Sequence, residues 1–229
     1  MSRFSKLLSV LIILHMIAGC SWFGGWWRST PEGRGTPADL YRNGIEFYRS
    51  GSYKKAIDEF LRLKEGYPLS KYAILAEMGV ADSYFSSDDY MAAETEYRDF
   101  MELHPTNENL PYVMYQIGMC NYNEMHSIDR DQTNTQMAIA DFERLIARFP
   151  SSKFSFMAEQ RLRECKKRLG EHEFYVGYFY FKKGEYQAAL SRFENISRNY
   201  ANLGLDYKVS YFLHETKRQL ERAEEQKAD

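Results

Sequence analysis

The side chains best able to do chemistry in this sequence are five histidines and three cysteines. The histidines are scattered, no two stand four residues apart, and there is no HExxH motif, so the spacing favours no metal site. They are His15, His104, His126, His172 and His214. The sequence also lacks a glycine-rich phosphate loop and a recognisable nucleophile motif. We therefore expect no enzyme activity, no metal and no cofactor.

Cys20 is the cysteine with a chemical context. Arg3 and Lys6 precede an apolar run over 7–17, which is shorter than the roughly 20 residues of a membrane-spanning helix. The sequence Ile17-Ala18-Gly19-Cys20 then resembles the bacterial lipobox, in which the thiol is acylated and the preceding segment removed. This resemblance predicts a signal peptide at 1–19, a lipid on Cys20 as the sole attached group, and attachment to a membrane. The alternative is an ordinary signal peptide with an incidental cysteine.

Residues 20–36 follow the lipid attachment point as a predicted tether. They contain all three tryptophans of the chain, Trp22, Trp26 and Trp27, and are otherwise rich in Gly, Ser, Thr and Pro. Indole rings prefer the membrane–water interface, so we expect them to lie there; a disordered linker is the alternative. Ser21 after the cysteine resembles the outer-membrane sorting choice of two-membrane bacteria.

The bulk composition excludes some partners and leaves one cysteine question open. The net charge is −2 with a pI near 6.3, so no basic excess points to nucleic acid. Cys120 and Cys165 would lie in an oxidising compartment after export. They either form a disulfide or stay buried as free thiols.

A repeat fills the region after residue 37. A small residue, an alanine, an aromatic residue and a proline recur with spacings of 12, 4 and 8, and the first two copies are offset by 37 residues. The copies are Gly44, Ala56, Phe60, Pro68; Ala81, Ala93, Tyr97, Pro105; Gly118, Ala138, Phe142, Pro150; and Gly177, Ala189, Phe193, with Ala201 in the proline position of the fourth copy. Small residues let two helices approach while a ring four residues later fills the groove beside them, and proline ends the second helix. The pattern predicts an all-α chain of antiparallel helix pairs, in repeats of about 37–72, 73–110, 111–152 and 153–201.

Two departures interrupt this spacing. The third copy inserts eight residues around 125–136, which we expect to form a polar loop. Pro150 and Gly177 stand 27 positions apart instead of 13, so an extra helix or one long helix is expected from about 153 to 169 and onward to 181. A further helix is expected at about 204–222, ahead of a frayed end. Ser52, Ser70 and Asp89 are candidate helix caps, and Pro111 suits a first turn.

The pattern resembles the tetratricopeptide repeat, and particular stretches resemble the family of outer-membrane assembly lipoproteins known as BamD or ComL-like lipoproteins. These stretches are AIDEFLRLKEGYP (56–68), LPYVMYQIGM (110–119), DRD (129–131), AIADFERLIARFPSSKF (138–154) and FYVGYFYFKKGEYQAALSRFENISRNY (174–200). The resemblance covers essentially the whole predicted mature chain, which is shorter after residue 201 than the family.

The resemblance implies a non-enzymatic scaffold. Such a protein is lipid-anchored to the outer membrane, faces the periplasm, and belongs to the β-barrel assembly (BAM) complex. The implied partners are a POTRA domain of BamA, other Bam lipoproteins and unfolded outer-membrane proteins. The alternative is a lipid-anchored repeat adaptor for cell-wall or division proteins.

The resemblance also suggests site residues. In this repeat type, positions 2, 5, 9 and 12 of the first helix line a concave groove; here they include Ile45, Leu75, Met78, Asp82 and Met119 beside many rings. The candidate peptide-binding rings are Tyr41, Tyr48, Phe85, Tyr112, Tyr115 and Tyr122; alternatively, some of these rings pack between helices. Arg192 and, second, Arg198 are candidates for BamA binding, with the guanidinium of Arg192 left free to pair with a partner carboxylate. The alternative for Arg192 is a surface pair with Glu194 or solvent.

Overall fold

Residues 35–228 are described by a computed structural model, and within them all regular structure is helical. This confirms the all-α prediction. The helices are α2 (Pro37–Arg49), α3 (Tyr53–Gly66), α4 (Lys71–Ser86), α5 (Tyr90–Leu103), α6 (Leu110–Asn123), α7 (Thr133–Arg148), α8 (Lys153–Lys182), α9 (Tyr186–Asn199) and α10 (Asp206–Ala228). The predicted signal peptide and tether, with Cys20 and the three tryptophans, lie outside the described residues.

The helix starts follow local side-chain chemistry. Thr36 and Asp39 form a reciprocal capping box at the start of α2. Ser70 and Asp89 each accept a backbone N–H from the first turn of α4 and α5, as their spacing predicts. Ser52 stands at the cap position of α3, but its side chain makes no capping hydrogen bond.

Glycines and rings hold the helix pairs together as the repeat spacing predicts. A Cβ atom on Gly44 would lie 2.4 Å from the ring of Phe60, and one on Gly118 would lie 2.5 Å from the ring of Phe142. Gly79 of the next helix approaches the other edge of Phe60, at 2.7 Å from the same hypothetical atom. Phe60 therefore packs both within its own helix pair and against the next one.

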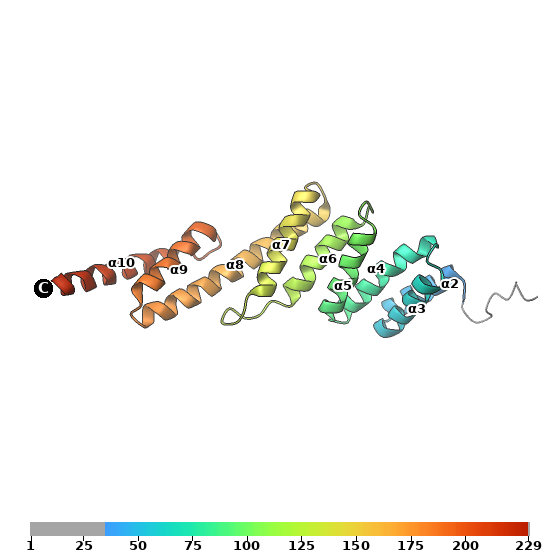
Figure 1. Cartoon of the computed structure of the whole chain (residues 1–229), viewed down its shortest axis with the longest axis horizontal. Helices are drawn as coiled ribbons and strands as arrows, with labels where there is room; N and C mark the ends of the chain where they lie inside the picture. Colours follow the sequence, from blue (N-terminus) through green and yellow to red (C-terminus); the bar gives the residue numbers. More distant parts are fainter. Residues whose placement is uncertain (1–34, 229) are drawn as a thin grey trace, which may run out of the picture.

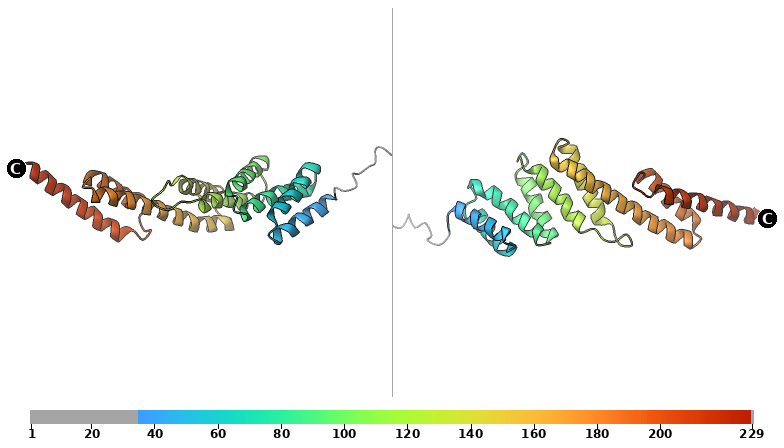
Figure 2. Two further views of the ribbon diagram at one scale, coloured as in Figure 1. Left: turned by 90° about the horizontal axis from the view of Figure 1, so that it is seen from below. Right: turned by 180° about the vertical axis from the view of Figure 1, so that it is seen from behind.

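Each helix packs chiefly on its neighbours in the chain, so the molecule is extended. Figure 1 shows the helices following one another along the long axis, with α2 and α10 at opposite ends, and the views of Figure 2 show the same order. The core is correspondingly divided into four hydrophobic clusters along the chain. This is the architecture of a solenoid, in which repeats contact only adjacent repeats.

A buried polar group also joins successive helices. Asp141 of α7 is 4% exposed and accepts hydrogen bonds from Arg98 of α5 at 3.1 Å, Asn121 of α6 at 3.2 Å and Arg144 at 2.9 Å. The carboxylate is thereby satisfied on several sides, which is what its burial requires.

The long junction before the fourth copy is a single helix. α8 runs unbroken for 30 residues, so of the two expected arrangements the long helix is confirmed. Figure 1 shows it (orange) extending from α7 to α9. Its first half packs on α6 and α7, and its second half pairs with α9. The C-terminal helix is longer than predicted, because α10 continues to Ala228.

The inserted loop of the third copy is shorter than predicted, and it is tied to α8. Helix α7 begins at Thr133, so the final residues of the expected loop are helical. His172 donates from Nδ1 to the carbonyl of Ile128 at 2.7 Å, and Arg168 donates to the carbonyl of His126 at 2.7 Å. The side-chain amide of Gln132 closes the loop by donating to two of its carbonyls.

Cys120 and Cys165 are free and buried. They lie in different hydrophobic clusters, and Cys165 approaches the sulfur of Met125 at 3.8 Å. Burial raises the pKa of both thiols to about 12, which keeps them protonated at neutral pH. Of the two predicted alternatives, the structure has the free thiols.

Within residues 35–228, no helix combines the length and apolar character needed to cross a membrane.

Candidate functional site

The proposed groove is built from the first helix of each pair, because these helices present repeat positions 2, 5, 9 and 12 on one side. Near its N-terminal end, Tyr41 stacks on Tyr72 of the next first helix with ring centroids 5.4 Å apart. Tyr48 shares a hydrogen bond of 2.9 Å with Ser86, across the same pair of helices. Phe85 packs edge-on against Tyr90 at 5.3 Å. These groove rings are half-buried, so each is positioned by its neighbours and still presents some surface.

Tyr115 does not belong to this surface. It is only 7% exposed, with Phe142 at 6.0 Å on one side and Phe154 at 5.9 Å on the other. The extended α8 places Phe154 over α6, and this covers a position that a regular repeat would leave open. The prediction that Tyr115 lines the groove is therefore wrong, and for this ring the packing alternative holds.

Asp82 lies between the second and third helix pairs. Its Oδ1 atom accepts hydrogen bonds from the hydroxyls of Tyr97 and Tyr112, both at 2.5 Å, and Gln116 donates to Tyr112 at 3.3 Å. Burial raises the pKa of Asp82, although the two tyrosine hydrogen bonds oppose that change. Burial, followed by the Asp82 charge, raises the pKa of both tyrosines. Tyr112, a predicted groove ring, thus serves as a hydrogen-bond donor to Asp82.

We expect Asp82→Asn to stabilise the protein at neutral pH. Because the pKa of Asp82 is higher in the folded than in the unfolded protein, the folded state retains this proton to a higher pH. The stability that the protonated carboxyl contributes is therefore present at low pH and is lost as pH rises through the raised pKa. The amide oxygen can still accept from Tyr97 and Tyr112 without carrying a charge. Urea unfolding should show the variant more stable by on the order of 1 kcal/mol at pH 7, with the difference closing as pH falls through the raised pKa toward about 4. A difference that does not change with pH would contradict this account.

Tyr122 lies near the C-terminal end of α6 and contacts α8. Its hydroxyl donates to Glu164 at 2.6 Å, and the guanidinium of Arg161 lies 5.1 Å from its ring centroid. Arg161 and Glu164 are themselves paired at 2.9 Å. The ring is half-buried and fixed in orientation by both charged groups.

Arg192 lies on α9, and its guanidinium is not free. Nη1 donates to both carboxylate oxygens of Glu173 on α8 at 3.0 Å, so the predicted free guanidinium and the alternative pair with Glu194 are both wrong. The Arg192 side chain remains 43% exposed. A shallow, largely polar cavity of about 290 Å³ beside it is also lined by Arg198, which makes no ion pair within the described residues. A carboxylate that entered this cavity could therefore pair with Arg192, which already binds Glu173, and with Arg198, which has no ion-pair partner among the described residues.

Three further groove positions of the repeat lie on α8, and the sequence-based prediction did not include them. The same repeat positions 2, 5 and 9 fall on Glu171, Phe174 and Tyr178 of α8. These three side chains line a cavity of about 310 Å³ together with Lys208 of α10. The repeat register counted from Gly177 is sufficient to predict all three positions, although the irregular spacing before Gly177 obscures it.

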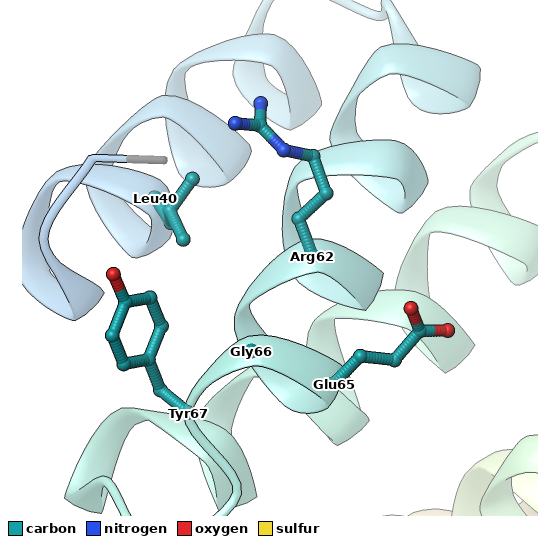
Figure 3. A pocket seen from close by; sticks show the side chains of 5 residues that line it. All are labelled: Leu40, Arg62, Glu65, Gly66 and Tyr67. Carbon is teal, nitrogen blue, oxygen red and sulfur yellow. The ribbon is translucent and has the colours of Figure 1, made fainter. Parts of the chain in front are cut away.

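A cavity at the opposite end marks where the described chain begins. Figure 3 shows Leu40 and Tyr67 facing each other there, with Glu65 pointing away. The hydroxyl of Tyr67 donates to the carbonyl of Gly35 at 2.8 Å. This contact fixes the start of the described chain against the end of α3, beside the first helix pair.

In the described part of the chain, no three His, Cys, Asp or Glu side chains gather as metal ligands.

Comparison with known proteins shows which family this chain resembles. The family model described as YfiO, an outer membrane lipoprotein, matches residues 34–229. Outer membrane protein assembly factor BamD of Vibrio cholerae is 28% identical over 207 residues, which cover 85% of this chain and 83% of that protein. Outer membrane protein assembly factor BamD of Rickettsia prowazekii is 29% identical over 199 residues, covering 86% and 78%.

Among solved structures, a tetratricopeptide repeat protein from Parabacteroides merdae is 15% identical with a TM-score of 0.46. The similarity covers 86% of this chain and 80% of that one.

Proposed function

The chain belongs to the YfiO family of outer membrane lipoproteins, and from this membership we propose that it is a lipid-anchored scaffold subunit of the outer-membrane β-barrel assembly complex. In this role it faces the periplasm, binds a POTRA domain of BamA and other Bam lipoproteins, and holds unfolded barrel precursors for insertion. The role is one of binding, not catalysis, and needs no cofactor beyond the lipid on Cys20.

The observation that carries the proposal is a row of half-buried aromatic rings at the predicted groove positions. Tyr41, Tyr48, Phe85 and Tyr122 come from three successive first helices, and each is half-buried with its orientation set by a neighbour. Rings held in this way give up little conformational freedom when a ligand binds. An extended peptide with its own aromatic side chains, such as an unfolded barrel strand, matches a long groove of this kind.

Crosslinking tests the groove directly. A photoreactive residue placed at Tyr48, Phe85 or Tyr122 should crosslink to a peptide from the end of a barrel precursor. Leu103 of α5 is 64% exposed and lies on a second helix, outside the predicted groove positions, so it provides the control position. Crosslinks from Leu103 but from none of the three groove positions would show that the groove is assigned to the wrong face.

Co-purification tests the complex. Tagged full-length protein extracted from membranes should bring down an outer-membrane barrel protein of the BamA type. Recovery of cell-wall synthesis or division enzymes in its place would favour the adaptor alternative.

The anchor has its own test. We expect Cys20→Ala to abolish incorporation of a palmitate analogue and to leave an uncleaved or soluble protein, because the thiol is the acylated group. Cys120→Ala and Cys165→Ala are the controls, since both thiols are buried and protonated and should leave labelling unchanged. Label that persists on the Cys20→Ala protein would rule out Cys20 as the acylation site.

A further inference from the structure

The last two first helices, α8 and α10, border an apolar cavity beyond the rings assigned to the groove above. The cavity has a volume of about 310 Å³, which is large enough to admit one aromatic side chain. Its walls are made by Ile128, Glu171, Phe174, Tyr175, Tyr178, Leu205 and Lys208. Three parts of the chain meet here: the inserted loop, the second half of α8 and the start of α10.

Two of the three rings at this cavity are more exposed than the rings of the other groove positions. Tyr175 is 47% and Tyr178 40% exposed, whereas the Phe174 beneath them is 6% exposed. Tyr178 is fixed by stacking on Phe174 at 6.3 Å and by edge contact with Phe212 at 5.4 Å. The cavity thus has Phe174 as its buried apolar floor, and two tyrosines, Tyr175 and Tyr178, that are partly exposed to solvent.

One positive charge stands over this floor. The Lys208 ammonium lies 4.0 Å from the ring centroid of Phe174 and makes no ion pair with any described residue. Glu171, the acidic residue at the rim, is instead within 3.9 Å of Lys167 on its own helix. An aromatic ring attracts a cation through its quadrupole and carries no net charge, so the ammonium can still pair with an anion.

We infer that this cavity binds an acidic–aromatic segment of an extended peptide. The aromatic side chain would enter between Tyr175 and Tyr178, and the neighbouring carboxylate would pair with Lys208. The inference rests on the proposed peptide-binding function and adds the chemistry of the ligand at the α8–α10 end of the groove. A recessed cavity with one cation suits a side chain, whereas a membrane-binding face presents several basic residues around an exposed apolar surface.

The test uses the acylated full-length chain in detergent micelles. The probe is a short fluorescein-labelled peptide with one Phe-Asp pair in a Gly-Ser background, and fluorescence anisotropy measures its affinity. Lys208→Glu should weaken binding of the Phe-Asp peptide about tenfold. A Phe-Asn peptide should bind the unaltered chain more weakly than the Phe-Asp peptide does. In Lys208→Glu, the two peptides should bind with nearly equal affinity, because the lysine that recognises the carboxylate is gone. Tyr175→Ser should weaken binding several-fold. Tyr207→Ser, one position from Lys208 but outside the cavity, should leave it unchanged.

Circular dichroism must show equal helical content for all variants, and Lys208→Gln offers a milder change if the charge reversal unfolds α10. Unchanged affinity in Lys208→Glu, Lys208→Gln and Tyr175→Ser would overturn the inference, as would equal affinity for a Phe-Lys peptide. It would also be overturned if Tyr175→Ser abolished self-association or binding to phospholipid vesicles while peptide binding persisted. Precursor crosslinks from Tyr48, Phe85 and Tyr122 test the proposed function separately; if those persist, only the α8–α10 site is wrong.

Discussion

Reversing the charge of Arg192 should weaken binding to a BamA POTRA domain by about 2–5 kcal/mol, which is the range for truncating or opposing one member of an interfacial charge pair. Arg192 is 43% exposed on α9, and the cavity beside it also contains the cation of Arg198. Isothermal titration calorimetry with the isolated POTRA domain measures the loss.

The internal pair with Glu173 complicates this variant, since Arg192→Glu also places two carboxylates side by side. A charge swap resolves the two effects. The double variant Glu173→Arg with Arg192→Glu restores an ion pair between α8 and α9. For partly exposed groups, such a pair contributes up to about 1 kcal/mol to stability. The charge at position 192 of α9 stays reversed in this variant. If Arg192 contacts the partner, the swapped protein should regain thermal stability and still bind weakly. If the swapped protein regains full binding, Arg192 acts only by joining α8 to α9.

Removing the ring of Phe142 should destabilise the protein by about 3–5 kcal/mol, the usual cost of truncating a buried aromatic side chain. The ring is fully buried and fills the space that the missing side chain of Gly118 leaves on α6. Gly118→Ala should destabilise by about 1–3 kcal/mol for the opposite reason, because the added methyl group overlaps the ring. Urea unfolding followed by circular dichroism measures both changes.

The double variant carries the sharper prediction. With the ring removed, the methyl group on residue 118 has room, so Gly118→Ala with Phe142→Ala should be less destabilised than the sum of the single variants. Gly66→Ala is the matched control: a Cβ atom there would contact nothing within 4 Å, and alanine favours the helix by up to about 1 kcal/mol. Additive losses would mean that the glycine and the ring do not share one space.

The helix pairs were predictable because they depend on local spacing. The small residue and the ring are 16 positions apart in three of the four copies, and Gly44 meets Phe60 in the structure as that spacing requires. The unbroken α8 was one of two expected outcomes: Gly170 directly follows 153–169, but no proline occurs between residues 151 and 182, and the helix continues through the glycine. The last turns of α10 were not predicted, because their charged sequence has no periodic apolar pattern that marks an end.

The site was less predictable because its contacts join residues far apart in the chain. Tyr115 occupies a groove position by register, but Phe154 reaches it only because α8 extends over α6. Glu173 and Arg192 are nineteen positions apart, and their pairing depends on how α9 folds back on α8. A periodic pattern specifies which face a residue occupies on its own helix. It does not specify which side chain arrives from the next one.

The length of α8 has a mechanical consequence. At about 1.5 Å per residue its 30 residues span about 45 Å, with one end seated on α6 and α7 and the other carrying α9. A rod of that length acts as a lever: a tilt of about 5° at its seat moves the far end by about 4 Å. Force applied by a partner on α9 would therefore reach the seat as torque, where Phe154 and Glu164 contact Tyr115 and Tyr122. Binding of a partner at α9 and the positions of Tyr115 and Tyr122 on α6 would then be coupled through helix α8.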